Sequence, residues 1–291
     1  MNTATLTSPA TTERATDPKV TAHFHASAAL YKLWSPQGHL HFGYWRWPLS
    51  PLDRSAMLDE LVHQVVGTLE PKEGQHLADL GCGYGAAARL VAKTYACKLD
   101  AFTVVPEQVV EGQRLADQED LDVHMHLRDF RSTELPAGSV DGAYALESIC
   151  YGAGHGKADV LKEAARILKP GGRFTLTDGF IQKPPTGFRK GMVRTVEEGW
   201  AVPCFPRQQA FLRDMRKAGF TNIMVKDLSF RVALCALHGL PLMAWTEVQR
   251  RFAGEPIDEL ERAHLRSCLL GILLGTQRDL FRYLMITATK A

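Results

Sequence analysis

Short apolar runs alternate with helical patterns along the middle of the chain. Strand-like runs occupy residues 98–104, 123–127, 140–146 and 173–177. Between them, apolar positions recur at helical spacing in residues 107–116 and 157–168, as in amphipathic helices. This alternation predicts a parallel sheet wound with helices. Ligands of such sheets lie across the carboxyl ends of the strands, so the residues that follow each strand are the first candidates for a site.

A further strand-like run is followed directly by a glycine-rich turn and an amphipathic helix. Its sequence is Asp79-Leu-Gly81-Cys-Gly83-Tyr-Gly85. Glycines at alternate positions let the backbone turn sharply and let a ligand lie against the main chain at a helix N-terminus. A dinucleotide loop has the spacing G-x-G-x-x-G and holds an anionic pyrophosphate, which the Asp79 carboxylate would repel. The loop therefore favours a ligand with a cationic amine, such as S-adenosylmethionine.

The residues after the next strands resemble those of class I S-adenosylmethionine-dependent methyltransferases. Thr103 and Gln108 form the pattern T-x-x-x-x-Q, which is similar to that of the sterol, tocopherol and prenyl-substrate members, whereas most of the family has an acidic residue for the ribose there. The pair Asp129-Phe130 is similar to the family's adenine site. Further motifs around Leu135-Pro136 and at residues 168–174 follow in the family's order, and the resemblance covers about residues 38–230.

The resemblance implies the family's fold and cofactor. The fold would be a Rossmann-like, doubly wound α/β fold, with a seven-stranded sheet, an antiparallel last strand, an N-terminal helical cap and an inserted lid. S-adenosylmethionine would be bound by Asp79, Gly81, Gly83, Thr103, Gln108, Asp129, Phe130 and Tyr44. Single positions also have structural explanations, because Asp79 could cap a turn, Asp129 could bond its own loop backbone and Thr103 could be an ordinary β-branched strand residue.

Changes in composition divide the chain into five expected segments. They are a disordered tail at 1–20, an N-terminal helical cap at 21–70, a cofactor-binding core at 71–180, a lid with a return strand at 181–243, and C-terminal helices with the last strand at 244–291. The run from residue 281 is expected to pair antiparallel with residues 223–230.

The fourth strand end carries the candidate catalytic residues Glu147, Tyr151 and His155. Sterol and prenyl-diphosphate C-methyltransferases have a similar glutamate, followed four positions later by an aromatic residue or histidine. Methylation of an alkene carbon leaves a carbocation that aromatic faces stabilise and that a base must deprotonate, a role for Glu147. Alternatively Glu147 starts a helix or holds the methionine amine. If His155 is the base instead, O- or N-methylation of a polar nucleophile becomes the expected reaction.

The segment before the last strands mixes basic and aromatic side chains. The planar guanidinium group of arginine binds phosphate oxygens, so this segment favours a prenyl diphosphate over a sterol as the substrate. Some relatives that the resemblance implies couple cyclisation to methylation. A solvated surface explains the same charges. The candidate substrate contacts are Tyr31, Trp34, Phe188, Arg189, Arg194, Trp200 and Arg207.

Composition limits the other function classes. The 291 residues are 45% hydrophobic, and the longest apolar stretch, residues 268–274, is far shorter than the roughly 20 residues of a membrane helix. The net charge is only +2, and the basic residues are distributed along the chain, so the sequence indicates no basic patch that would bind nucleic acid. Six cysteines lack C-x-x-C spacing, so neither a metal site nor a disulfide framework is indicated and the cytoplasm is the expected compartment. The expected partner is a small hydrophobic substrate. The sequence does not decide whether the protein forms a homo-oligomer.

Overall fold

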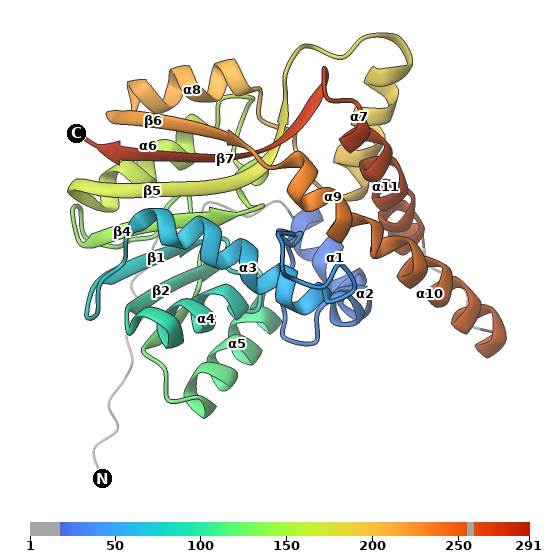
Figure 1. Ribbon diagram of the computed structural model, residues 1–291, viewed down its shortest axis with the longest axis horizontal. Coiled ribbons are helices and arrows are strands. Elements are labelled where there is room, and N and C mark those ends of the chain that lie inside the picture. Colours follow the sequence, from blue (N-terminus) through green and yellow to red (C-terminus); the bar gives the residue numbers. More distant parts are fainter. Residues whose placement is uncertain (1–17, 255–258) are drawn as a thin grey trace.

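One seven-stranded sheet forms the centre of the protein, which a computed structural model describes at residues 18–254 and 259–291 (Figure 1). The strand order is β3-β2-β1-β4-β5-β7-β6. Strands β1 to β5 pair in parallel, and β7 runs antiparallel to its neighbours β5 and β6. The strands are β1 (His76–Leu80), β2 (Lys98–Thr103), β3 (Val123–Leu127), β4 (Val140–Leu146), β5 (Leu168–Ile181), β6 (Phe220–Asp227) and β7 (Phe281–Lys290). The predicted doubly wound α/β fold with an antiparallel last strand is confirmed.

Helices cover both faces of the sheet because successive side chains of a strand point to opposite faces. On β1, Leu77 belongs to the core on one face, whereas Ala78 and Leu80 belong to the core on the other. The first face is covered by α3 (Arg54–Val66), η1 (Gly67–Leu69), α4 (Ala86–Tyr95) and α5 (Pro106–Gln118), and the second by α6 (Ala158–Ile167) and α8 (Gln208–Lys217). The ends of the strands are therefore where the sheet can meet a ligand.

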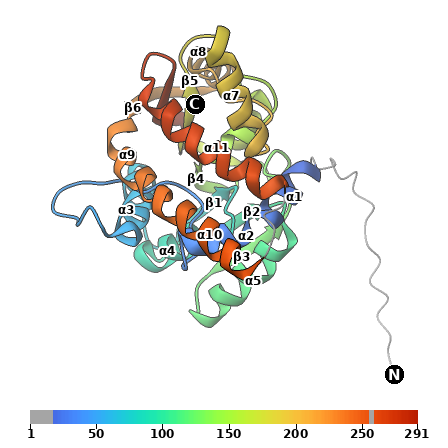
Figure 2. The same ribbon diagram turned by 90° about the vertical axis from the view of Figure 1, so that its right-hand side faces the viewer.

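The other helices form a cap over the carboxyl ends of the parallel strands, on the right in Figure 1 and facing the viewer in Figure 2. They are α1 (Pro18–Ala26), α2 (Ala28–Trp34), α7 (Gly187–Gly199), α9 (Ser229–Leu237), α10 (Gly239–Ala253) and α11 (Glu259–Thr276), and the short η2 (Ile149–Tyr151) follows β4. Helix α11 packs against α7, α1 and α10, and α10 packs against α2. The cap thus joins segments from both ends of the described chain.

The cap differs from the segments expected from the sequence. Residues 1–17 lie outside the described residues, and α1 begins at Pro18, inside the expected tail. Helix α3 lies within the expected N-terminal cap but packs on the sheet. Within the expected lid, α8 covers the sheet and β6 extends it. Strand β6 pairs antiparallel with β7 as predicted, but it ends at Asp227 because α9 begins at Ser229.

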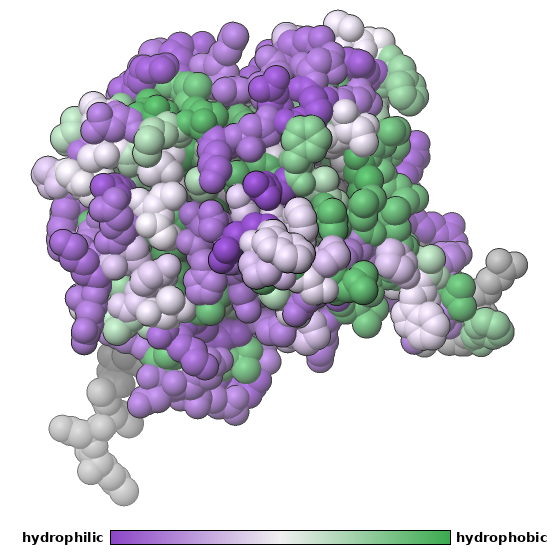
Figure 3. Space-filling model, viewed as in Figure 1, coloured by the Kyte–Doolittle hydropathy of each residue, from purple (hydrophilic) through white to green (hydrophobic). Residues whose placement is uncertain are grey.

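The cap exposes several large apolar side chains on its outer surface, where Figure 3 shows hydrophobic residues gathered on the right. Trp245, Val248 and Phe252 of α10 and Leu269 and Leu273 of α11 are among them. Within the described residues, no helix has both the length and the apolar character that crossing a membrane requires.

Candidate functional site

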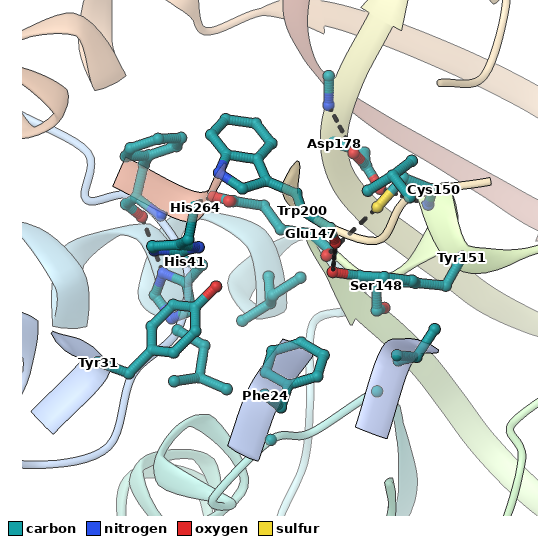
Figure 4. A pocket seen from close by; sticks show the side chains of 18 of the residues that line it. Phe24, Tyr31, His41, Glu147, Ser148, Cys150, Tyr151, Asp178, Trp200 and His264 are labelled. Atoms are coloured by element: carbon teal, nitrogen blue, oxygen red, sulfur yellow. Dashed lines mark hydrogen bonds between the residues drawn. The ribbon is translucent and has the colours of Figure 1, made fainter. Parts of the chain in front are cut away.

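A cavity of about 510 Å³ lies between the strand ends and the cap (Figure 4). One wall comes from the carboxyl-terminal ends of strands β1 to β5 and the loops that follow them, and the opposite wall comes from α1, α2, α10 and α11. Most of its lining side chains are aliphatic or aromatic. A pocket of this size with few polar groups suits an apolar small molecule.

The glycine-rich loop after β1 forms part of the cavity wall as predicted, through Gly81 and Gly83. Both residues have positive φ, +100° and +54°, which glycine adopts without strain. A Cβ at Gly81 would overlap Ser148, and one at Gly83 would lie 2.6 Å from Leu40 Cδ1. The loop therefore brings bare backbone to the cavity surface at the start of α4.

Asp79, in contrast, is buried beneath this loop and does not line the cavity. It lies opposite Tyr144 in the pairing of β1 with β4, on the side of the sheet covered by α3 and α4. Burial raises the pKa of the Asp79 carboxyl to about 7. Its Oδ2 has no hydrogen-bond partner within the described residues. Strand alternation turns this side chain away from the cavity lining. The expected contact of Asp79 with a ligand amine stays a prediction.

The predicted ribose and adenine residues meet at the cavity. The Thr103 hydroxyl donates to Gln108 Oε1 at 2.6 Å, and this bond leaves the Gln108 amide nitrogen to donate to a ligand. Asp129 and Phe130 also line the cavity. Arg131, which the sequence did not single out, bonds both oxygens of Asp129, with Nε 2.9 Å from each. Together with the glycine loop, these groups fit an adenosyl ligand.

Glu147 lies where the strand-end wall meets the cap. Its backbone has φ +53°, and its Oε1 accepts from the Phe42 N–H and from the Tyr283 hydroxyl, both at 2.6 Å. Oε2 makes no hydrogen bond within the described residues, so it can take a proton from a ligand. Burial raises the pKa of the Glu147 carboxyl to about 8 even though the two donors oppose this, and the nearby Asp178 raises it further.

The other two candidate catalytic residues differ in their position relative to the cavity. Tyr151 lines the cavity, and its hydroxyl donates to the Trp200 carbonyl at 3.0 Å. His155 does not line it. Its Nδ1 lies 3.1 Å from the Phe205 carbonyl, and its own carbonyl accepts from the Arg207 N–H. His155 is therefore held outside the cavity lining, and its role as a base stays a prediction.

The predicted aromatic contacts also separate into two groups. Tyr31, Trp34 and Trp200 line the cavity. Tyr44 is buried in the core beside α3, because Gly43 approaches the backbone of α3 so closely that the chain turns inward there. Phe188 is 80% exposed at the start of α7 and lies outside the cavity.

The basic side chains of the expected lid do not reach the cavity. Arg189 pairs with Asp279 at 2.8 Å, and Arg194 pairs with Glu198 at 2.6 Å along the exposed side of α7. The Arg207 backbone bridges Ile181, which places Arg207 in the sheet-side wall of the lid. Arg189 and Arg194 thus form ion pairs at the surface, and none of the three arginines lines the cavity. Their contact with a substrate stays a prediction.

Several lining residues were not among the candidates from the sequence. Asp178, at the end of β5, accepts from the Cys150 and Gly179 N–H groups, and burial raises the pKa of its carboxyl to about 6. Asp178 directly follows the strand run predicted at 173–177, and this position could have indicated it. Phe24 and His264 come from α1 and α11, and only the three-dimensional packing of the cap brings them to the cavity.

The histidines of the segment before α3 bond each other. His39 Nδ1 lies 3.1 Å from His41 Nε2, and His39 Nε2 lies 3.0 Å from Asp59 Oδ1. Among the described residues, no three histidine, cysteine or acidic side chains are grouped so that they could hold a metal.

Comparisons with known proteins bear on this arrangement. A family model described as a methyltransferase domain matches residues 77–172. The 27-O-demethylrifamycin SV methyltransferase of Amycolatopsis mediterranei (strain S699) is 28% identical over 275 residues, which are 90% of this chain and 92% of that protein. The O-methyltransferase cnsE of Penicillium expansum is 30% identical over 66% of this chain and 68% of its own length. Matches to two further O-methyltransferases span 53% of each relative.

Solved structures share the fold over nearly the whole chain. The cyclopropane synthase MmaA2 from Mycobacterium tuberculosis has a TM-score of 0.82 at 18% identity, over 94% of this chain and 98% of that one. The geranyl diphosphate C-methyltransferase from Streptomyces coelicolor A3(2), in complex with Mg²⁺, geranyl diphosphate and S-adenosyl-L-homocysteine, has a TM-score of 0.67 at 17% identity, over 91% and 98%. At these identities the likeness concerns the fold.

Proposed function

Because the chain belongs to the S-adenosylmethionine-dependent methyltransferases, with S-adenosylmethionine as its cofactor, we propose that it methylates a hydroxyl oxygen of an apolar, uncharged small molecule. Glu147 is the proposed general base. The observation that carries this proposal is a partly buried carboxyl, that of Glu147, with one unbonded oxygen, Oε2, in a cavity that is otherwise lined mainly by apolar side chains.

The residues assigned to the cofactor are those at the strand ends. Gly81 and Gly83 would lie against it, the Thr103–Gln108 pair would bond its ribose hydroxyls, and Asp129 its adenine amine. When bound, the cofactor supplies an electrophilic methyl group on a sulfonium. The protein's own part is then to orient a nucleophile toward that methyl and to remove its proton.

The raised pKa of Glu147 supports the choice of a hydroxyl. A general base works best when its pKa lies near the working pH, and burial holds this carboxyl at about 8. The relative of which the match covers 92% is named 27-O-demethylrifamycin SV methyltransferase, and other relatives are named as O-methyltransferases. The lining argues for an apolar substrate body around that hydroxyl.

The cavity does not favour a prenyl diphosphate as the substrate. Arg189, Arg194 and Arg207, which were expected to hold the diphosphate, lie outside the cavity. The cationic lining side chain Arg131 is engaged by Asp129 and also lies 3.7 Å from Asp159. A buried diphosphate would need several such partners.

The second candidate reaction is methylation of an alkene carbon of an uncharged isoprenoid. Aromatic rings support it, because Tyr151 and Phe24 stand 6.0 Å apart between ring centroids along the cavity wall, and ring faces stabilise a carbocation. In this reaction the methyl transfer itself needs no base, and Glu147 would act only afterwards.

Glu147→Gln separates the two reactions. For a hydroxyl substrate it should lower methyl transfer about 10²- to 10⁴-fold, with the affinity for S-adenosylhomocysteine unchanged. For an alkene, S-adenosylhomocysteine should still form while the product changes. His155→Gln, outside the cavity, serves as the control and should keep full activity. Both variants should be assayed with labelled cofactor on phenols, aliphatic alcohols, prenyl alcohols and sterols. Full activity of Glu147→Gln on every substrate would refute the assignment of Glu147.

A further inference from the structure

A network of hydrogen-bonded side chains ends at the residue that binds the proposed base. It consists of Asp59 in α3 and of His39 and His41, and we call it the histidine network. His39 bonds Asp59 through Nε2 and His41 through Nδ1, and His41 Nδ1 lies 2.8 Å from the Phe42 carbonyl oxygen. Both histidines are buried, whereas the Asp59 side chain is 45% exposed. Both ring nitrogens of each buried histidine thus have a partner, as buried polar groups require.

The Phe42 carbonyl decides where the protons of the histidine network lie. A carbonyl oxygen only accepts, so His41 Nδ1 must carry a proton. Burial lowers the pKa of His41 to about 3, so its ring is neutral and its Nε2 accepts from His39 Nδ1. His39 Nε2 and the Asp59 carboxyl then share a further proton. The network therefore fixes His41 in the tautomer that donates to the backbone at Phe42.

The backbone is held on both sides of Phe42. Trp34 Nε1 donates to the His41 carbonyl at 3.1 Å, and this carbonyl belongs to the same planar peptide unit as the Phe42 N–H. The next peptide unit is held at the Phe42 carbonyl by His41. Phe42 lies in the connection between α2 and α3, residues 35–53. Side chains, rather than the backbone ladder of a helix or strand, therefore fix the orientation of these two peptide units.

This orientation matters because the Phe42 N–H is one of the two donors to Glu147 Oε1. The Phe42 ring also lies beside that of Tyr283, the other donor, at 6.4 Å between centroids. A donor to a carboxylate stabilises its ionised form, so the Phe42 bond opposes the rise of the Glu147 pKa that burial causes. His41 and Glu147 both line the cavity (Figure 4). The hold on Phe42 therefore bears on how strongly Glu147 binds a proton.

We propose that His41 and Trp34 are positioning residues for Glu147, which fix the peptide units on either side of Phe42 so that its N–H stays on the carboxylate. The rest of the histidine network holds the His41 ring in the required tautomer. The inference rests on the proposed function only for the role of Glu147 as the base.

The proton affinity of Glu147 can be measured without a substrate. Protein labelled with carbon-13 at the glutamate side-chain carboxyls is titrated by nuclear magnetic resonance between about pH 6 and 10, and the Glu147 signal is identified by its absence in Glu147→Gln. His41→Phe and Trp34→Phe each remove one donor and keep an aromatic ring. Each should raise the midpoint of the Glu147 titration by about 0.5–1 pH unit. His41→Asn, whose amide nitrogen can replace Nδ1, should give a smaller rise.

Other titratable side chains lie close enough to Glu147 for its charge to act on them. They are Tyr31, Cys150, Tyr151, Asp178, Cys235 and Tyr283. The substitutions at His41 and Trp34 replace none of these groups. The direction of the shift also separates positioning from a purely structural role, because a segment that lost its structure would expose Glu147 and lower its pKa toward the ordinary value.

Two residues outside the histidine network provide matched controls. His23→Phe replaces a buried histidine of α1, and Glu60→Gln removes the carboxyl that follows Asp59 in α3 and pairs with Arg46. Both should leave the midpoint unchanged.

An unchanged or lower midpoint in a folded His41→Phe or Trp34→Phe protein would overturn the inference, as would an equal rise in His23→Phe. The proposed function is tested separately by the pH profile of kcat/KM in the same variants. If the titration midpoint rises and the profile does not follow it, Glu147 is positioned as inferred but is not the base.

Discussion

Glu147 has a backbone conformation that few residues other than glycine adopt. Its N–H still donates to the Thr177 carbonyl in the pairing of β4 with β5, at 2.8 Å, and its φ of +53° then turns the chain out of the strand. A left-handed non-glycine residue costs of order 1 kcal/mol or more and persists where the surroundings fix it. The Phe42 N–H and the Tyr283 hydroxyl provide this fixation, because both bond the side chain.

The pH dependence of turnover should report this carboxyl. A general base acts in its ionised form, so kcat/KM should rise with pH through about 8, the value to which burial raises the pKa of Glu147. Tyr283→Phe removes a donor that stabilises the carboxylate, so it should move the midpoint upward by about one pH unit. Steady-state rates between pH 6 and 10 measure this. A profile in Tyr283→Phe that coincides with that of the unmodified enzyme would contradict the assignment.

The ribose pair should behave as one unit. Gln108→Leu removes the amide that faces the cavity and should weaken S-adenosylhomocysteine binding about tenfold. Thr103 acts through its hydrogen bond to Gln108, so Thr103→Val in the Gln108→Leu background should add little. Calorimetric titration of the two single variants and the double variant measures this. Fully additive losses would mean that Thr103 contacts the ligand independently.

The sequence predicted the position of a single residue at the site where that residue lies at the end of a parallel strand. Gly81, Thr103, Asp129 and Glu147 all line the cavity, because parallel strands bring their carboxyl ends to one edge. Asp79 lies inside its strand rather than after it, so the two-residue alternation of β1 decides its direction. His264 could not be predicted, because its position depends on how α11 packs on the rest of the cap.

Helices α7 and α11 pack through small residues, and this contact supports one wall of the cavity. A Cβ at Gly199 would overlap Ser267, and one at Gly271 would lie 2.6 Å from Trp200 Cη2. The Ser267 hydroxyl also donates to the Thr195 carbonyl at 2.9 Å. Trp200 therefore lines the cavity because glycine in α11 leaves room for its ring.

Two glycines of α7 should respond oppositely to alanine. Gly199→Ala should destabilise the protein by about 1–3 kcal/mol, because the added methyl must push α7 and α11 apart. Gly191, in the same helix, has nothing within 4 Å of an added Cβ, so Gly191→Ala should stabilise it by about 0.5–1 kcal/mol through helix propensity. Urea unfolding followed by far-ultraviolet circular dichroism compares them. Equal effects of the two substitutions would contradict the packing described here.

Elements of the sheet were predictable closely, and those of the cap were not. The run 140–146 coincides with β4, and 107–116 lies within α5, because periodicity and burial agree there. In the lid, basic residues between prolines suggested a ligand contact, but the structure gives Arg189 and Arg194 acidic partners on the surface. Composition does not distinguish a charge that meets a ligand from one that meets a neighbouring side chain.

Burial shifts the pKa values of several carboxyls and imidazoles in this protein. The two kinds of group have opposite effects on how the stability of the folded state changes with pH. Burial raises the pKa of Asp79 to about 7, of Glu147 to about 8 and of Asp178 to about 6. Such groups bind protons more tightly in the folded state, so their contribution to stability is lost as the pH rises through these values. Burial lowers the pKa of three histidines, of His23 to about 4 and of His41 and His264 to about 3.

The histidines act in the other direction, because the unfolded chain takes up their protons below its own value of 6.5, so stability rises with pH up to that point. Above pH 6.5 these histidines no longer change the stability, whereas the carboxyls still do. We therefore expect the Tm of the cofactor-free protein to fall by about 2–4 °C between pH 6.5 and 8.5. Glu147→Gln and Asp79→Asn should each flatten this fall, since the amides do not titrate. Differential scanning calorimetry across this range measures it, and a Tm that does not fall toward pH 8.5 would mean that Asp79 and Glu147 are already ionised in the folded protein at neutral pH.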